Sequence, residues 1–241
     1  MKKTKRIISL EEYITIIRDT YNCEGCGPIE KIFYRGQSNC DYKLIPSLAH
    51  KIKGHTSETE NYIGFEKKII ERSKLEYPFI FKENKLLDEL ALMQHYGIPT
   101  RLMDVTENPL VALYFACISN LDIDGEVFAF AAGYGAQLYS SYDAKRIYKD
   151  KKIAFVRTKI FSERQRIQQG LFMWFPKDKL EGLDKESDVI HDRIIIPNEC
   201  KGGLINDLKM LGISEKTLFP ENIDACCKEL LSDITKDAYS C

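Results

Sequence analysis

Apolar side chains at helical spacing predict several helices in this chain. Residues 9–21 begin with Ser9, and Glu12 follows three positions later, a pattern typical of a helix N-cap. The same spacing predicts helices over residues 57–76 and 84–97, and a glycine closes the second, as is common at helix C-termini. We expect each of these helices to pack one face against a core, because their opposite faces are charged.

Residues 109–119 differ, because apolar side chains lie almost all round a helix of this length. This pattern predicts burial on every side. Pro109 stands near the first helical position, where its missing N–H costs nothing. Helical spacing returns over residues 201–213 and, after a turn, in a terminal helix within residues 214–234.

Four segments rich in β-branched and aromatic residues predict strands. They are residues 31–38, 125–133, 166–176 and 189–197. In the first we expect Gly36 to end the strand in a turn. Helices interleaved with non-adjacent strands favour an α+β fold over a regular βαβ repeat. We predict a mixed, mostly antiparallel sheet core flanked by helices, in one domain over residues 1–241 with its motifs in about residues 30–230.

The charge balance excludes a strongly basic surface. The chain has 35 basic and 36 acidic side chains and a net charge of -1, which does not favour non-specific nucleic-acid binding. We expect the basic residues 1–6 to form a solvated tail. No apolar run approaches the roughly 20 residues that cross a bilayer, so we expect a cytoplasmic protein with no membrane partner.

Eight cysteines do not predict a disulfide scaffold in a chain of this length. Cys23 and Cys26 form one C-x-x-C pair, which supplies two of the four ligands of a structural zinc site. No second pair follows, and Cys40, His50 or His55 would complete the site only through the fold. We therefore expect free thiols and no metal.

A cluster of polar residues precedes the apolar helix. Its members are Thr100, Arg101, Asp104 and Thr106. On an extended segment the two threonines and the aspartate share one face, and the arginine takes the other. Buried polar groups need partners, so the cluster is either self-satisfied, through an Arg101–Asp104 ion pair that braces the loop, or directed at a ligand.

Other polar positions are candidates for binding or catalysis. Arg35 stands beside a glycine, where it either caps a turn or presents its guanidinium fork to a phosphate or carboxylate. We expect His95 to be a helix-dipole partner or a core residue rather than a catalyst. Gln168 and Gln169 precede an apolar strand, where they either bind an amide, a hydroxyl or a base edge, or lie on an exposed strand edge.

Several motifs together resemble the FRG domain family, named after its (F/Y)-R-G motif. They are "FYRGQ", "LALMQHYGIPTRLMDVTENPLVALYFAC", "RIQQGLFMWF" and "LFPENIDACCKEL". The motifs occur in the family's order over about residues 33–228, and the long central block is a specific match. The resemblance implies a bacterial or phage protein with a role in antiviral defence.

More distantly, the chain resembles the arginine-specific type of mono-ADP-ribosyltransferase. Residues 34–36, "YRG", resemble that family's first element, a strand carrying Tyr-Arg-Gly. Residues 100–116 resemble its second element, a Ser-Thr-Ser strand that leads into an Asn-Pro…Ala…Phe-Ala helix, with Thr106 or Thr100 near the Ser-Thr-Ser place. The likeness implies an ADP-ribosyltransferase-like fold.

The third element of that family carries a catalytic glutamate, and here its place holds a glutamine. Gln168 or Gln169 stands at that place, and Glu163 lies several residues earlier. The resemblance implies a carboxylate that holds the nicotinamide ribose and stabilises positive charge, which a neutral amide does less well. Either Glu163 or Glu126 supplies this acid, or the site binds a nucleotide without the chemistry.

The first hypothesis is an NAD-dependent ADP-ribosyltransferase or NAD hydrolase, acting as a toxin or defence effector on a protein target. NAD would be its substrate. The residues assigned to catalysis are Arg35, Gln169 and Glu163. The residues assigned to binding NAD or a similar nucleotide are Tyr34, Arg35, Gly36, Thr100, Arg101, Asp104 and Thr106.

Two alternatives remain. The second hypothesis is a non-catalytic binding module that senses a nucleotide or a phage component, which accounts for the missing glutamate. The third is nucleic-acid binding through Arg101, Arg164 and Arg166, against which the near-neutral charge counts.

Overall fold

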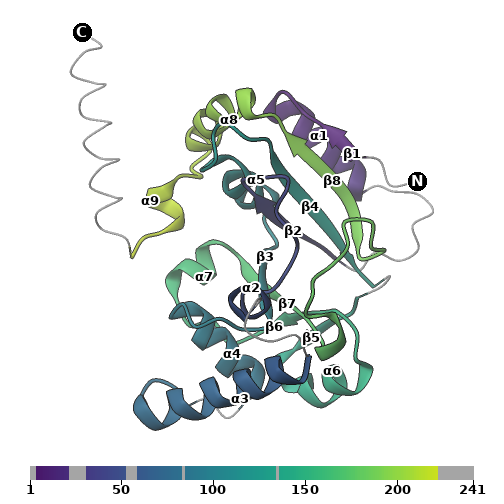
Figure 1. Cartoon of the computed structure of the whole chain (residues 1–241). Coiled ribbons are helices and arrows are strands. Elements are labelled where there is room, and N and C mark those ends of the chain that lie inside the picture. Colours follow the sequence, from purple (N-terminus) through teal and green to yellow (C-terminus); the bar gives the residue numbers. More distant parts are fainter. Residues whose placement is uncertain (1–3, 22–30, 53–58, 83–84, 134–135, 222–241) are drawn as a thin grey trace.

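The computed structural model describes residues 4–21, 31–52, 59–82, 85–133 and 136–221 (Figure 1). Eight strands in these residues form one sheet. They are β1 (Thr4–Arg6), β2 (Lys31–Gln37), β3 (Leu102–Thr106), β4 (Gly125–Ala132), β5 (Leu138–Ser140), β6 (Ala154–Arg157), β7 (Gly170–Trp174) and β8 (Ile190–Ile196).

Helices flank this sheet (Figure 1). In the described residues they are α1 (Leu10–Tyr21), α2 (Ser47–Ile52), α3 (Thr59–Glu76), α4 (Leu86–His95), α5 (Pro109–Cys117), α6 (Ala144–Asp150), α7 (Glu163–Ile167), α8 (Asn198–Met210) and α9 (Glu215–Leu218). None of the helices described is both long and apolar enough to cross a bilayer.

The strand order is β1-β8-β4-β2-β3-β7-β6-β5. The two outermost pairs, β1–β8 and β5–β6, are parallel, and the pairs between them are antiparallel. The predicted α+β fold with a mixed, mostly antiparallel sheet is therefore confirmed.

The sheet is nearly divided in two at its centre, between β2 and β3. These strands share a single residue pair, Tyr34 with Thr106. By contrast, β2 pairs with β4 along its whole length, and β3 pairs with β7 along its whole length. Beyond the Tyr34–Thr106 pair, β2 and β3 separate, and the sheet opens between its two halves.

Three of the apolar cores pack against the sheet, and one of them joins its two halves. One core, with Ile32 and Val127, lies under α1, α5 and α8. Another, with Leu102 and Trp174, lies under α4 and α6. The remaining faces of both halves share one core, in which the Phe33 ring of β2 lies 4.6 Å from the Phe155 ring of β6. The sheet must therefore curve strongly, because two strands separate β2 from β6 in the strand order.

Helix α5 lies unusually close to the sheet, and glycines on two strands permit this. A Cβ atom on Gly36 of β2 would lie 1.8 Å from the Ala112 carbonyl oxygen, and one on Gly125 of β4 would lie 2.3 Å from the Ala116 carbonyl oxygen. The prediction that Gly36 ends the strand in a turn is therefore wrong. It lies inside β2, because only glycine leaves room for the helix backbone.

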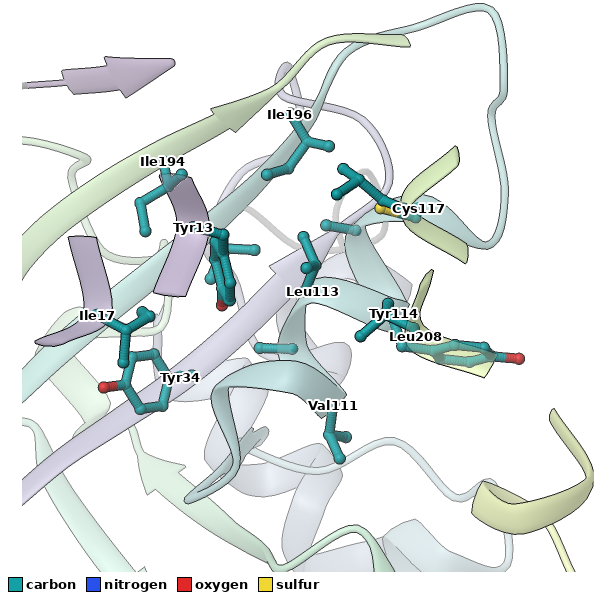
Figure 2. Close-up of a cluster of buried hydrophobic side chains, with 14 of the residues drawn as sticks. Tyr13, Ile17, Tyr34, Val111, Leu113, Tyr114, Cys117, Ile194, Ile196 and Leu208 are labelled. Carbon is teal, nitrogen blue, oxygen red and sulfur yellow. The ribbon is translucent and has the colours of Figure 1, made fainter. Parts of the chain in front are cut away.

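Figure 2 shows the apolar core of the half of the sheet that contains β2, β4 and β8. Tyr13 and Ile17 of α1 lie beside Tyr34 of β2, and Leu113 of α5 points toward the same cluster. The prediction that residues 109–119 form a helix buried on every side is close to correct, because most side chains of α5 are buried. Asn108 caps this helix by accepting hydrogen bonds from two backbone N–H groups, and Pro109 follows at the first helical turn.

Other element predictions need correction. Residues 4–6 are not a free tail but a short edge strand paired with β8. The predicted strand over residues 166–176 begins only at Gly170, because Ser162 caps the short helix α7 just before it. Strands β5 and β6 were not predicted. The predicted terminal helix in residues 214–234 lies mostly outside the described residues, which include only α9.

Candidate functional site

A pocket of about 350 Å³ lies where β2 and β3 separate. The elements around it are β2, β3, β7, the C-terminal end of α4, the N-terminal half of α5, α7 and the residue after α9. The polar side chains among its lining residues are Arg35, Gln94, His95, Asp104, Thr106, Ser162, Arg164, Gln165 and Gln168, with Tyr34 also at its border. We call this the first pocket.

Arg35 is fixed in the opening between the two strands. One of its terminal nitrogens donates a hydrogen bond of 2.6 Å to the main-chain oxygen of Asp104, so its side chain spans from β2 to β3. Its Nε atom is buried and has no hydrogen-bond partner among the described residues. Burial lowers the pKa of the Arg35 guanidinium from its ordinary value, and the nearby Asp104 carboxylate opposes this. Arginine stays charged in proteins, so the site contains a cation whose Nε–H group is available to donate a further hydrogen bond.

Asp104 presents a carboxylate at the same opening. It is exposed, and its Oδ2 atom accepts a hydrogen bond of 2.8 Å from the side-chain amide of Gln94. The Gln94 oxygen in turn accepts a bond of 2.6 Å from the Thr100 hydroxyl. This chain of bonds orients the carboxylate beside Arg35, and no described residue forms an ion pair with it.

Thr106 closes the pocket at the strand junction. Its hydroxyl donates to the main-chain oxygen of Gln168 at 2.6 Å and accepts from the backbone N–H of Asn108 at 2.9 Å. The Gln168 amide donates to the Leu218 main-chain oxygen at 3.0 Å. These bonds tie the end of β3 to the segment between α7 and β7 and to α9, so this wall is rigid.

Arg164 and His95 also line the first pocket. Arg164 projects from α7, and its guanidinium carbon lies 5.8 Å from the centre of the Phe219 ring. Phe219 also meets Phe115 of α5 edge-on, at 6.0 Å between ring centres. His95, at the end of α4, packs against the ring of Tyr96. The pocket therefore combines two arginines with aromatic surface and only one carboxylate, that of Asp104.

Two buried members of the predicted polar cluster, Thr100 and Arg101, do not line this pocket. Thr100 is buried, and its hydroxyl donates to the Gln94 side-chain oxygen and accepts from the backbone N–H of Leu102. Arg101 is buried too, and it forms an ion pair with Glu66 of α3 while lying 4.7 Å from the Trp174 ring centre. The suggested Arg101–Asp104 ion pair is therefore wrong. The segment is extended as expected, but the partner of Arg101 comes from another helix.

The acids suggested for catalysis lie elsewhere. Glu163 is exposed and bonded to Arg166, which holds the pKa of its carboxyl below the ordinary value. Glu126 is fully buried on β4 between Lys185 and Arg193. Gln169 is exposed in a left-handed backbone conformation, with φ of 48°, and its main-chain groups bond to Glu107 and Arg166. None of these three side chains lines the first pocket.

Tyr34 and Gly36 border the pocket mainly through their backbone. The Tyr34 ring points into the core with Tyr13 and Ile17, and burial raises the pKa of its phenol well above the ordinary value. The phenol therefore stays neutral and does not act as a base. Because Gly36 has no side chain, the backbone of α5 at Ala112 lies close to β2, and Ala112 and Phe115 line the pocket.

The comparison with protein families identifies one matching segment, residues 30–124. The match is to the FRG domain. The chain contains an FRG domain. No curated protein and no solved structure matches the chain.

The FRG domain supplies more than half of the residues that line the first pocket. Arg35, Asp104 and Thr106 fall within residues 30–124, as do the pocket-lining ends of α4 and α5. Arg164, Gln168 and Phe219 come from beyond the matched segment. The pocket is therefore built jointly by the FRG domain and the chain that follows it.

Sequence reasoning did not find the apolar part of this pocket. Phe115, Phe172 and Phe219 carried no signal that set them apart from core residues. Gln165 and Ser162 were not singled out, because they precede the strand predicted over residues 166–176 and no helix was predicted there. The helical signal there is Ser162, which accepts a hydrogen bond from the Gln165 backbone as an N-cap.

The described residues include no group of three or more potential metal ligands. Cys40, Cys117 and Cys200 are free thiols. Cys23, Cys26 and His55 lie outside the described residues.

Proposed function

We propose that this chain binds a nucleotide of the NAD type in the first pocket. The observation that carries the proposal is the convergence of Arg35 and Arg164, from elements far apart in the sequence, on one pocket with aromatic walls. A pocket of about 350 Å³ is within the usual size range of small-molecule sites.

Charge supports an anionic ligand. Within the part of the chain that the structure describes, the Arg35 side chain is bonded only to a main-chain oxygen, and Arg164 contacts an aromatic ring rather than a carboxylate. Guanidinium groups bind phosphate oxygens through paired, charge-assisted hydrogen bonds, which are stronger than neutral ones. A phosphate held between these arginines would complete their hydrogen bonding.

Aromatic and amide side chains support a ligand that also carries a ring. Phe115 and Phe219 offer apolar ring surface beside Arg164, on which a base can pack. The side chains of Gln94 and Gln165 lie in the same lining and offer both hydrogen-bond donors and acceptors. A nucleotide combines the phosphate and the ring that these groups accommodate.

Calorimetric titration of NAD into purified variants tests this proposal. We expect Arg164→Ala to weaken NAD binding at least tenfold, because it removes a charged group from the pocket. Arg166→Ala is the matched control, since Arg166 lies two residues along the same helix and is bonded to Glu163 outside the pocket. Equal affinity of both variants for NAD, at the level of the wild-type chain, would contradict the proposal.

A second candidate function is NAD-consuming chemistry, as an ADP-ribosyltransferase or NAD hydrolase. The observation in its favour is the exposed Asp104 carboxylate, which Gln94 orients beside Arg35. In such a reaction the bond from ribose C1′ to nicotinamide breaks, and nicotinamide leaves with the electron pair. Water or a protein side chain then bonds to C1′ and releases its proton. A carboxylate near C1′ would stabilise the positive charge in between.

Asp104→Asn tests this candidate, because it keeps an acceptor for Gln94 and removes the charge. We expect NAD affinity at or above the wild-type level, since the pocket becomes more positive, and a loss of NAD turnover of about 100-fold or more. The measurement is release of nicotinamide from labelled NAD. Binding without turnover in the wild-type chain would reject the enzymatic candidate and leave a binding module.

A role as a toxin or defence effector would follow from NAD consumption. Expression of the wild-type chain in bacteria should then lower cellular NAD and slow growth, and the Asp104→Asn variant should do neither. Nucleic-acid binding receives less support, because Arg101 is buried with Glu66 and Arg166 is bonded to Glu163.

A further inference from the structure

A second pocket, of about 410 Å³, adjoins the first across Arg35. Three residues line both pockets, namely Arg35, Gln94 and Asp104. The other lining residues of the second pocket are Gln37, Tyr42, Lys43, Ile45, Ser47, His50, Leu102 and Met103. It therefore follows the opening between β2 and β3 in the direction in which the two strands separate.

Gln37 is the polar residue of the second pocket that lacks a partner. Its side chain is 6% exposed, and its Oε1 atom has no hydrogen-bond donor among the described residues. Its amide group makes one long bond of 3.4 Å, to the main-chain oxygen of Lys43. A buried acceptor without a donor destabilises a fold, and a ligand that donated a hydrogen bond here would satisfy it.

Gln37 and Arg35 form a pair that matches a particular ligand pattern. They are two residues apart on β2, so they lie on the same face of the strand, with Cα atoms about 7 Å apart. Arg35 offers the unpartnered Nε donor, and Gln37 offers the unpartnered oxygen. A ligand that meets both has an anionic or carbonyl group at Arg35 and a hydroxyl or amino group one short step further into the second pocket.

The chemistry around this pair also fits a phosphate-linked ligand. Lys43 adds a positive charge and His50 adds an imidazole to the second pocket, and both are exposed. Asp104 is the acidic residue of the lining, and it is shared with the first pocket. The cationic charge is thus concentrated at and beyond the boundary between the two pockets.

We propose that the two pockets together hold one dinucleotide. Its pyrophosphate lies at Arg35, one half lies in the first pocket against the aromatic rings, and the other half lies in the second pocket. In the second pocket a ribose hydroxyl or an amino group donates to Gln37. This inference rests on the proposed nucleotide binding and deepens it, because it assigns one half of the ligand to the second pocket and to Gln37.

The inference is tested by measuring how variants of each pocket bind NAD and the two mononucleotides that compose it. NAD, AMP and nicotinamide mononucleotide are each titrated into the wild-type chain, Gln37→Met and Arg164→Ala. We expect Gln37→Met to weaken NAD about tenfold and to weaken only one of the two mononucleotides. Arg164→Ala, in the first pocket, should weaken NAD and the other mononucleotide.

Further variants guard against loss of folding. Gln37→Met preserves side-chain length, and its thermal unfolding is compared with that of the wild-type chain. Lys43→Ala changes an exposed residue of the same pocket and should weaken the same ligands as Gln37→Met by a few-fold. Lys67→Ala, on the exposed face of α3, is the matched control and should change no affinity.

The outcomes distinguish failure of this inference from failure of the proposed nucleotide binding. If the wild-type chain binds NAD but Gln37→Met and Lys43→Ala bind it equally well, the second pocket does not hold part of the ligand and the inference fails alone. Equal weakening of both mononucleotides by Gln37→Met would also overturn it. If the wild-type chain binds none of the three nucleotides, the proposed function itself fails.

Discussion

Arg101 shows at the residue scale how a polar residue in a motif can serve the fold. Its side chain is about as buried as that of its partner, Glu66, at 5% and 6% exposure. The guanidinium also lies over the Trp174 ring. The fold tolerates this buried ion pair because each charge compensates the other. If one of the two residues were removed, the other would be left as an uncompensated buried charge.

Arg101→Ala should therefore lower the free energy of unfolding by about 3 to 5 kcal/mol. The loss arises mostly from the Glu66 carboxylate left without its partner. Chemical denaturation measures the change. Arg72→Ala is the control, because Arg72 forms an exposed ion pair with Glu76 on the same helix, α3, and such pairs contribute about 1 kcal/mol or less. Similar losses in both variants would contradict this account of Arg101.

The sequence was informative about residue types and less so about partners. Arg35 and Thr106 were singled out, and both line the first pocket. The pairing of Arg101 with Glu66 could not be predicted, because the two residues are 35 positions apart and meet only in the folded chain. Motif position alone placed Arg101 and Thr100 at a ligand, and the structure places both in the interior.

At the scale of elements, the contact between α5 and β2 determines the shape of the site. Gly36 lets the backbone of α5 approach the strand, and this brings Val111 and Phe115 to the pocket edge. Any larger side chain at this position must push the helix away from the sheet.

Gly36→Ala should therefore destabilise the chain by about 2 kcal/mol or more and also weaken ligand binding in the first pocket. The added Cβ would meet backbone, which cannot move aside as a flexible side chain can. Gly203→Ala in α8 is the matched control, because nothing lies near its added Cβ and alanine favours a helix. We expect thermal unfolding to show a stabilised control and a destabilised Gly36→Ala variant. A Gly36→Ala variant as stable as the control would be inconsistent with the close approach.

Long elements were predictable and short ones were not. Helices α1, α3, α4 and α5 and strands β2, β4 and β8 follow from residue spacing, because each buries enough side chains to show a period. Strands β1, β5 and β6 have three or four residues each, too few to show one. The start of β7 was misplaced because the Ser162 cap of α7 competes with the strand pattern after it.

At the scale of the whole molecule, the site results from the topology of the sheet. The opening exists because β2 and β3 share one residue pair while each pairs fully with its other neighbour. Sequence patterns predict strands but not where two neighbours separate, since that depends on how the two halves pack on their shared core. The sequence could therefore suggest residues of the pocket but not where in the fold the pocket lies.

The FRG domain accounts for part of this architecture. Its matched segment contains β2, β3, α4 and α5, and so includes the opening itself. The opposite wall, with Arg164 and Phe219, belongs to the chain beyond residue 124. We infer that the FRG segment requires its following chain to complete a ligand site.

Calorimetric titration of NAD into the wild-type chain and Arg35→Ala tests whether NAD binds in these pockets, because Arg35 lines both. We expect saturable binding of one NAD to the wild-type chain and loss of that binding in Arg35→Ala. Arg18→Ala, on the exposed side of α1, should bind as the wild-type chain does. Undiminished NAD binding by Arg35→Ala, or no binding by the wild-type chain, would show that these pockets are not an NAD site.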